Sequence, residues 1–167
     1  TMKEKRILLL DKQRIAFKLR RMAFEIWERN CDEKEIVVIG INGSGKVVAD
    51  NLVEILHEIS PLKIRTITLT INKKSPLDFA YEGTENLTGK TVVLVDDVAN
   101  SGKTLMYSLN CLLAYNLKKV MVAVLVDRNH KSFPIAADIV GHTVATTIQD
   151  HIDVETSGKK VKAVYLE

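Results

Sequence analysis

The sequence is poor in cysteine, in net charge and in long apolar runs, and each absence excludes a class of protein. Its two cysteines, Cys31 and Cys111, lie far apart, with no C-x-x-C pair and no histidines at zinc spacing. They provide neither a disulfide framework nor a zinc motif and are typical of a reducing compartment. The net charge of +3 gives no argument from composition for nucleic-acid binding. The longest apolar runs are short and interrupted by charges, which excludes a transmembrane helix.

What is present is typical of a globular domain. Of the 167 residues, 46% are hydrophobic and 27% are charged, which is enough apolar material for a sizeable core. No signal-peptide pattern precedes the first helical segment. We therefore expect residues 1–167 to form one cytoplasmic domain with no membrane partner.

Apolar blocks alternate with helical blocks along most of the chain. Strands are predicted at 36–41, 64–71, 91–95 and 119–126, and helices at 11–30, 47–59 and 104–117. The polar segment 72–89 is predicted to be a long loop, and the short extended pieces after residue 128, DIVGHTVATT and VKAVYLE, a small β appendage. Continuous apolar strands separated by helices favour an α/β fold, a central parallel sheet flanked by helices on both faces. Ligands bind such sheets beyond the carboxyl ends of the strands.

The first predicted helix has apolar residues at near-helical spacing. We expect its buried face to comprise Ile15, Leu19, Met22, Phe24 and Ile26, with Asp11 as the N-cap.

The stretch from Gly40 to Lys46, GINGSGK, resembles the phosphate loop of a nucleoside triphosphatase. It follows an apolar strand and leads into a helical pattern, as that loop does. The next position requires a Ser or Thr hydroxyl for Mg²⁺, but Val47 occupies it. A P-loop kinase or hydrolase is therefore retained only as an alternative.

A second candidate begins with two adjacent acids, Asp96 and Asp97, at the end of the strand TVVLV. Adjacent carboxylates repel one another and are costly to bury, so Mg²⁺, hydroxyl groups or a base should satisfy them. The turn that follows offers consecutive backbone N–H groups at the start of a helix, which suits a phosphate group. Its residues are Ala99, Asn100, Ser101, Gly102, Lys103 and Thr104. Together these elements predict a sugar-phosphate site.

The string VVLVDDVANSGKTL resembles the phosphoribosyl-pyrophosphate (PRPP) motif of type I phosphoribosyltransferases. The segments ILLLDKQRIAFKLRRMAFEIWERN and VLVDRNHKSFPIAADIVGHTVATT are similar to the corresponding parts of the PyrR family of pyrimidine operon regulators. This resemblance covers nearly the whole chain and implies the type I phosphoribosyltransferase fold with a small C-terminal hood. It also implies transfer of phosphoribose from PRPP to uracil, giving UMP and pyrophosphate, with Mg²⁺ as cofactor, a homodimer or higher homo-oligomer, and RNA as a second partner.

The resemblance also implies roles for individual residues. Asp96 and Asp97 would hold the ribose hydroxyls directly or through Mg²⁺, and 99–104 would bind the 5′-phosphate. The remaining groups are a pyrophosphate loop (Asn42, Gly43, Ser44, Gly45), a flexible loop over pyrophosphate (Lys73, Lys74, Tyr81) and a hood over the nucleobase (Asp127, Arg128, Phe133, Pro134, Ile135).

Some positions depart from the family pattern. Ser44 stands where relatives usually carry Lys or Arg, and the flexible loop is shorter and lacks an Arg-Asp-Asp string. Of the positions that bind RNA in PyrR, Arg21, His130 and Lys131 match, whereas Phe24, Ala136 and His142 replace His, Arg and Lys. Losing several cations weakens RNA binding, so we expect little RNA affinity. A non-catalytic regulator that senses PRPP or a nucleotide, and binds RNA or protein, is the main alternative function.

Overall fold

A computed structural model describes residues 6–72, 74–75, 77–82, 86–145 and 150–167. In chain order the elements are β1 (Ile7–Leu10), α1 (Lys12–Arg29), β2 (Glu35–Ile41), α2 (Ser44–Ile59), β3 (Lys63–Ile71), β4 (Phe79–Glu82), β5 (Thr91–Ala99), α3 (Lys103–Leu112), β6 (Lys119–Arg128), β7 (Ile139–Val144), β8 (Ile152–Ser157) and β9 (Lys160–Leu166). No helix among the described residues is long and apolar enough to cross a membrane.

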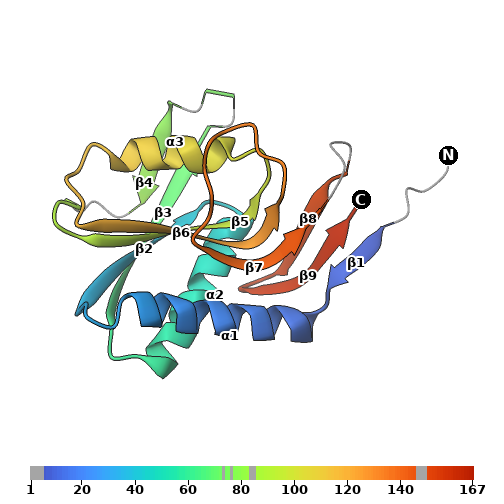
Figure 1. Ribbon diagram of the computed structural model, residues 1–167, viewed down its shortest axis with the longest axis horizontal. Helices are drawn as coiled ribbons and strands as arrows, with labels where there is room; N and C mark the ends of the chain where they lie inside the picture. The colour runs from blue at the N-terminus through green and yellow to red at the C-terminus, as the bar shows by residue number, and fades with distance from the viewer. Residues whose placement is uncertain (1–5, 73, 76, 83–85, 146–149) are drawn as a thin grey trace.

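Six of the described strands form the main sheet, in the order β4-β3-β2-β5-β6-β7. All neighbouring strands pair in parallel except β3 and β4, which pair antiparallel. Helices α1 and α2 cover one face of this sheet and α3 covers the other (Figure 1). The predicted α/β fold, a central parallel sheet between helices, is confirmed.

Alternate residues of each central strand supply the two halves of the core. In β2, Ile36 and Val38 pack with α1 and α2, whereas Val37 and Ile39 face the α3 side. Because successive strand side chains point to opposite faces, a strand covered on both faces must be apolar at every position. This explains the continuous apolar runs in the sequence.

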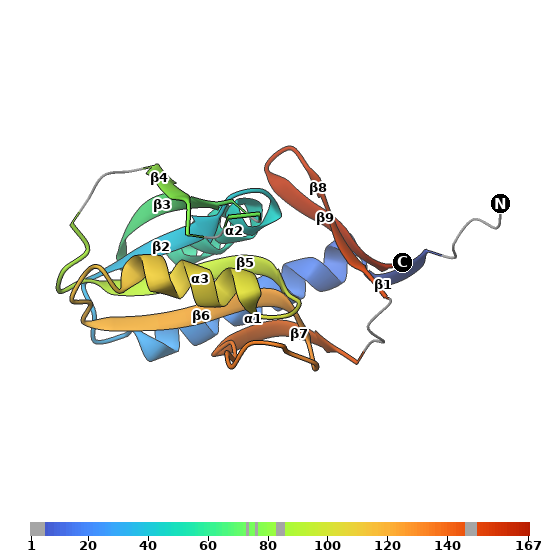
Figure 2. The same ribbon diagram turned by 90° about the horizontal axis from the view of Figure 1, so that it is seen from above.

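A second, three-stranded sheet joins the two ends of the chain in the order β1-β9-β8. Figure 2 shows the β8–β9 hairpin standing to one side of the main sheet, next to α2. The amide of Asn51 in α2 donates to the carbonyl of Lys159 in the hairpin turn at 2.9 Å. At the other end, the Arg6 guanidinium stacks on the Tyr165 ring at 3.7 Å. The predicted C-terminal β appendage is therefore present, and it also recruits β1.

The structure corrects several sequence-based boundaries. The segment DIVGHTVATT was expected in the appendage, but β7 extends the main sheet beside β6. The loop predicted at 72–89 contains β4, which forms a hairpin with β3. Phe24 was expected in the core, yet it is 45% exposed while Ala23 is fully buried. Phe24 is two residues from both Met22 and Ile26, a separation that places it on the opposite side of the helix.

Candidate functional site

The carboxyl ends of β2, β5 and β6 meet at one edge of the main sheet because these strands are parallel neighbours. Gly40 of β2 pairs with Val95 of β5, and Ala99 of β5 pairs with Asp127 of β6. The segments that leave these strand ends are therefore brought side by side. They include most of the residues to which the sequence assigns a function.

Asp96 and Asp97 lie within the last part of β5, because its pairing with β6 continues past them to Ala99. Asp96 is buried, with only 7% of its surface exposed. Its Oδ1 accepts from the N–H of Asp97 at 2.8 Å, and Oδ1 of Asp97 accepts from the N–H of Val98 at 2.7 Å. These local bonds hold both carboxylates in place.

The turn at the start of α2 lies directly against Asp96. A Cβ placed on Gly45 would come within 2.8 Å of Oδ1 of Asp96 and within 3.2 Å of its Cα. Only glycine allows the helix backbone to approach the carboxylate this closely. The two glycine-containing segments of the sequence, at 42–45 and at 99–104, therefore belong to one site.

The turn after β5 leads directly into α3. Gly102 is its N-cap residue and has φ 85°, ψ −3°, in the left-handed region that glycine favours. The hydroxyl of Ser101 accepts from the N–H of Lys103 at 3.2 Å. Residues 99–104, together with Asp96, line a hollow at this end of the helix. Backbone N–H groups at a helix start, next to a hollow, suit a phosphate group, and binding of a phosphate here stays a prediction.

The 131–135 segment packs against the outer side of this turn. The carbonyl of Ser101 accepts from the N–H groups of Ser132 at 2.9 Å and Phe133 at 3.1 Å. The Phe133 ring contacts Tyr107 of α3 edge-on, at a centroid distance of 6.4 Å. A Cβ on Gly102 would come within 2.6 Å of Cγ2 of Ile135. In this structure the apolar hood residues thus cover the turn, and their role over a nucleobase stays a prediction.

An ion pair at the end of β6 holds the beginning of the 131–135 segment. The ammonium of Lys131 pairs with the carboxylate of Asp127 and donates to the carbonyl of Arg128 at 2.6 Å. The Arg128 guanidinium in turn donates to Oδ1 of Asn100 at 3.5 Å. This role of Lys131 is not among those predicted from the sequence. The available signal was its position four residues after Asp127, with the opposite charge.

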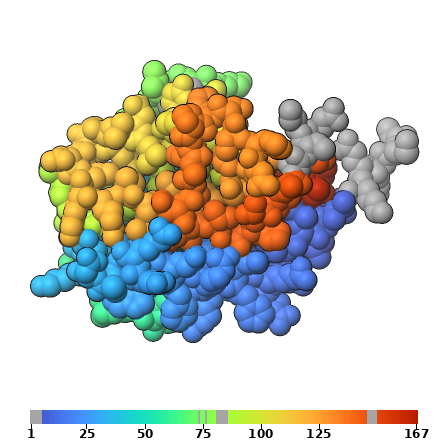
Figure 3. Space-filling model, viewed as in Figure 1, coloured from blue at the N-terminus to red at the C-terminus, as the bar shows by residue number. Residues whose placement is uncertain are grey.

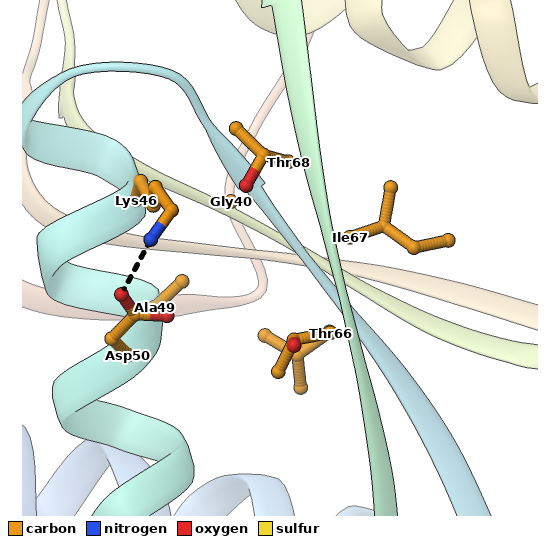
Figure 4. A pocket seen from close by; sticks show the side chains of 8 residues that line it. Gly40, Lys46, Ala49, Asp50, Thr66, Ile67 and Thr68 are labelled. Carbon is orange, nitrogen blue, oxygen red and sulfur yellow. Dashed lines mark hydrogen bonds and ion pairs between the residues drawn. The ribbon is translucent and has the colours of Figure 1, made fainter. Parts of the chain in front are cut away.

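The turn between β2 and α2 differs from a triphosphatase phosphate loop. Only Asn42 and Gly43 separate the two elements, and Ser44 already belongs to α2. Gly43 has φ 96° and is the N-cap of α2. Lys46 turns away along the helix, where its ammonium pairs with Asp50 at 3.0 Å (Figure 4). A phosphate loop needs a longer backbone turn with the lysine directed to the phosphates, so this geometry does not support the P-loop alternative.

The remaining pyrophosphate-loop and flexible-loop residues are placed only in part. The hydroxyl of Ser44 donates to the carbonyl of Val154 in β8 at 3.5 Å. Lys73 lies outside the described residues. Lys74 is exposed, in the connection between β3 and β4, and its N–H donates to Oδ1 of Asn72 at 3.0 Å. Tyr81 lies in β4, paired with Leu69. Because β3 is parallel to β2, this connection leaves the same edge of the sheet as the site.

The acids of the site suit Mg²⁺, a hard cation that prefers carboxylate oxygens. Within the described ranges, no group of three or more His, Cys, Asp or Glu side chains could hold a metal ion. A Mg²⁺ ion at Asp96 and Asp97 would therefore take most of its ligands from water and from a phosphorylated substrate. This is how Mg²⁺ is usually bound in sites that use phosphate groups.

The positions that match RNA-binding residues are partly engaged inside the protein. Arg21 donates to the carbonyls of Val140 at 3.1 Å and Gly141 at 2.6 Å. Lys131 is paired with Asp127, as described above. His130 is exposed. Two of these three residues, Arg21 and Lys131, therefore have structural partners.

Comparisons with known proteins agree with this geometry. The family described as "Phosphoribosyl transferase domain" matches residues 8–157. The chain belongs to the phosphoribosyl transferase family. It is 35% identical to "Bifunctional protein PyrR" of Fusobacterium nucleatum, over 95% of this chain and 97% of that protein. It is 36% identical to the protein of the same name from Alkaliphilus metalliredigens, over 90% and 88% of the two chains.

Solved structures show the same fold. The hypoxanthine phosphoribosyltransferase of Trypanosoma cruzi matches with a TM-score of 0.81 at 14% identity, covering 96% of this chain and 95% of that one. A hypoxanthine-guanine phosphoribosyltransferase of Bacillus anthracis matches with a TM-score of 0.71 at 22% identity, covering 83% and 82%. The chain thus has the type I phosphoribosyltransferase fold, as its PRPP-like motif predicts.

Proposed function

We propose that this phosphoribosyltransferase transfers the phosphoribosyl group of PRPP to uracil, giving UMP and pyrophosphate. One observation carries the PRPP half of the proposal: the buried carboxylate of Asp96 lies between a helix start suited to a phosphate and the glycine turn at Gly45. The uracil half rests on the resemblance to the PyrR family, which extends over nearly the whole chain.

In this reaction the bond between C1′ and pyrophosphate breaks, and a bond from C1′ to N1 of uracil forms as N1 loses its proton. The N–H groups of the turn 99–104 bind the 5′-phosphate and fix the ribose. Asp96 and Asp97 hold the ribose hydroxyls and stabilise the positive charge that develops around C1′. Bound Mg²⁺ supplies positive charge that offsets the charge on the departing pyrophosphate.

The carboxylates can be tested by substituting both with the isosteric amide. Asp96→Asn with Asp97→Asn should lower the conversion of labelled uracil to UMP by at least about 100-fold, because charge stabilisation in the transition state is lost. Asp50→Asn is a matched control, since its carboxylate is 49% exposed on α2 and lies outside the site. Thermal melting should show that both variants are folded. Unchanged turnover in the double variant would remove the carboxylates from the mechanism.

A second function, a non-catalytic regulator that senses PRPP or a nucleotide, is favoured by Ser44. This residue replaces the cation usual in the family, and its hydroxyl bonds to the carbonyl of Val154. A thermal-shift panel of PRPP, UMP, GMP and ATP with Mg²⁺ would rank the ligands, since a bound ligand raises the melting temperature. Stabilisation by PRPP without formation of UMP from uracil would favour the regulator over the enzyme.

A further inference from the structure

Helix α1 and strand β7 meet along a seam that is closed at one end. In Figure 3 the blue atoms of α1 and the orange atoms of β7 lie against one another on the face shown. Arg29 donates to the carbonyl of Asp138 at 3.2 Å, and Arg21 donates to the carbonyl of Gly141 at 2.6 Å. These arginines join the C-terminal half of α1 to the beginning of β7.

The other end of the α1–β7 seam is open. Here a hollow of about 240 Å³ is lined by Leu10, Arg14, Phe17, Lys18 and His142. Leu10 is only 1% exposed and forms an apolar floor, whereas Phe17 is 65% exposed and forms an apolar wall. A large exposed aromatic ring beside a hollow is a feature that needs an explanation in a folded protein.

Most of the surface that lines the hollow is apolar, and the three polar residues at it are all basic. Within the part of the chain that the structure describes, the side chains of Arg14, Lys18 and His142 have no hydrogen bond or ion pair. Asp11 accepts from the backbone N–H of Arg14 at 2.8 Å as the helix cap. Burial, Lys18 and Arg14 lower the pKa of His142. Arg14 and Lys18 are like charges four residues apart on α1, and an anion between them would relieve their repulsion.

We propose that this hollow binds a small organic anion, with a flat apolar body against Leu10 and Phe17 and an acidic group between Arg14, Lys18 and His142. The acidic group is a phosphate or a carboxylate, since either accepts from a guanidinium and an ammonium. The hollow is smaller than the 300–1,000 Å³ that is usual for drug-sized ligands, so the body is about one ring in size. A macromolecular partner would need a far larger surface.

The binding residues lie on β1, α1 and β7, and they share no side chain with the proposed PRPP site. The site is therefore additional to the proposed function and does not depend on it. Phosphate-bearing probes would also enter the PRPP site, so the readout must report on the hollow itself. The ring protons of His142 provide that readout by NMR, because the chain has 4 histidines and His142→Gln identifies the signal.

The experiment titrates the protein with phenyl phosphate and with benzoate, which present the two acidic groups on the same ring. Two controls each lack one half of the ligand: inorganic phosphate has no ring, and phenol has no phosphate or carboxylate group. We expect phenyl phosphate or benzoate to shift the His142 signal saturably, with an apparent affinity at least about tenfold above that of either control. Which of the two binds more tightly identifies the acidic group.

Two pairs of substitutions test the assignment of the cations. Arg14→Gln with Lys18→Gln should weaken binding by at least about tenfold, because two charge-assisted contacts are lost. Lys12→Gln with Arg20→Gln removes the same charge from exposed positions of the same helix and should change the affinity less than about twofold. Phe17→Ala should weaken binding of the aromatic probes and leave inorganic phosphate unaffected.

Several results would overturn the proposal. The proposal is wrong if the NMR signal of His142 does not shift with either phenyl phosphate or benzoate at millimolar concentration. If phenol bound as tightly as phenyl phosphate, the acidic group would not be needed for binding. If inorganic phosphate bound as tightly as phenyl phosphate, the apolar ring would not be needed. Equal effects of the two double substitutions would show that only the net charge matters. If an RNA oligonucleotide moved the signal while the small anions did not, the surface would instead be assigned to nucleic acid.

Discussion

The close approach of α2 to β5 makes Gly45→Ala the most informative single substitution. The added methyl group would lie 2.8 Å from Oδ1 of Asp96 and 3.4 Å from Cβ of Ile41. An ordinary contact between these groups needs roughly half an ångström more. Either Asp96 or the beginning of the helix must therefore move. Asp96 is buried and its backbone is fixed by pairing with Val124 of β6, so we expect the displacement to reach the carboxylate.

The cost to stability should be small. Overpacking costs about 1–3 kcal/mol, while replacing glycine by alanine in a helix gains up to about 1 kcal/mol. The net loss of about 1 kcal/mol corresponds to a fall in melting temperature of about 2–4 °C for a chain of this size. The effect on turnover should be larger, because a misplacement of about 1 Å can cost about 100-fold. The displacement expected for Gly45→Ala is about half an ångström, so we expect kcat/KM for uracil and PRPP to fall by about 10- to 100-fold.

Gly89→Ala is the control for that measurement. Gly89 has φ 77° with nothing within 4 Å of an added Cβ, so its cost is conformational only, about 1–2 kcal/mol. It lies before β5, at the opposite end of the strand from the acids. It should lose as much stability as Gly45→Ala while keeping full turnover. Equal turnover in the two variants would refute the claim that the turn at Gly45 sets the position of Asp96.

The remaining predictions concern the phosphate turn, the hairpin and the α1–β7 seam. Gly102→Ala should abolish ribose 5-phosphate binding in calorimetry and lower the free energy of unfolding by about 1–3 kcal/mol, because φ is positive and the methyl group of Ile135 occupies the space. Asn51→Ala should destabilise by about 1–2 kcal/mol in urea unfolding, because its amide joins α2 to the β8–β9 turn. Lys18→Gln should raise the pKa of His142 in an NMR titration, because a nearby positive charge lowers it. Since that pKa is lowered in the folded protein, stability is lost as the pH falls through the range in which His142 becomes protonated, and Lys18→Gln should reduce this loss.

The parts of the fold that depend on local pattern could be predicted from the sequence. The buried strands appear in the sequence as continuous apolar runs because both of their faces are covered. The residues of the predicted phosphate turn directly follow β5, and their order suits a sugar phosphate. The sequence predicts that Asp96 and Asp97 follow the strand, because the apolar run ends at Val95. In the structure the backbone pairing with β6 continues to Ala99, since pairing depends on the neighbouring strand and not on side-chain polarity.

The parts that depend on distant contacts could not be predicted. Which sheet β7 joins is decided by its pairing with β6, and a short alternating segment fits either sheet equally well. The contact between Gly45 and Asp96 joins two segments that are adjacent only once β2 and β5 have paired. The same holds for the packing of Ile135 on Gly102. Sequence motifs thus proposed the members of the site, and the sheet order determines which of them touch.

The two bonds from the backbone of Ser101 to the 131–135 segment also restrict how molecules enter and leave. On that side the wall of the site cannot swing outward without breaking main-chain hydrogen bonds and separating Phe133 from Tyr107. The 131–135 segment therefore forms a fixed wall on that side of the turn, and we expect substrate and product to pass on another side of the proposed site.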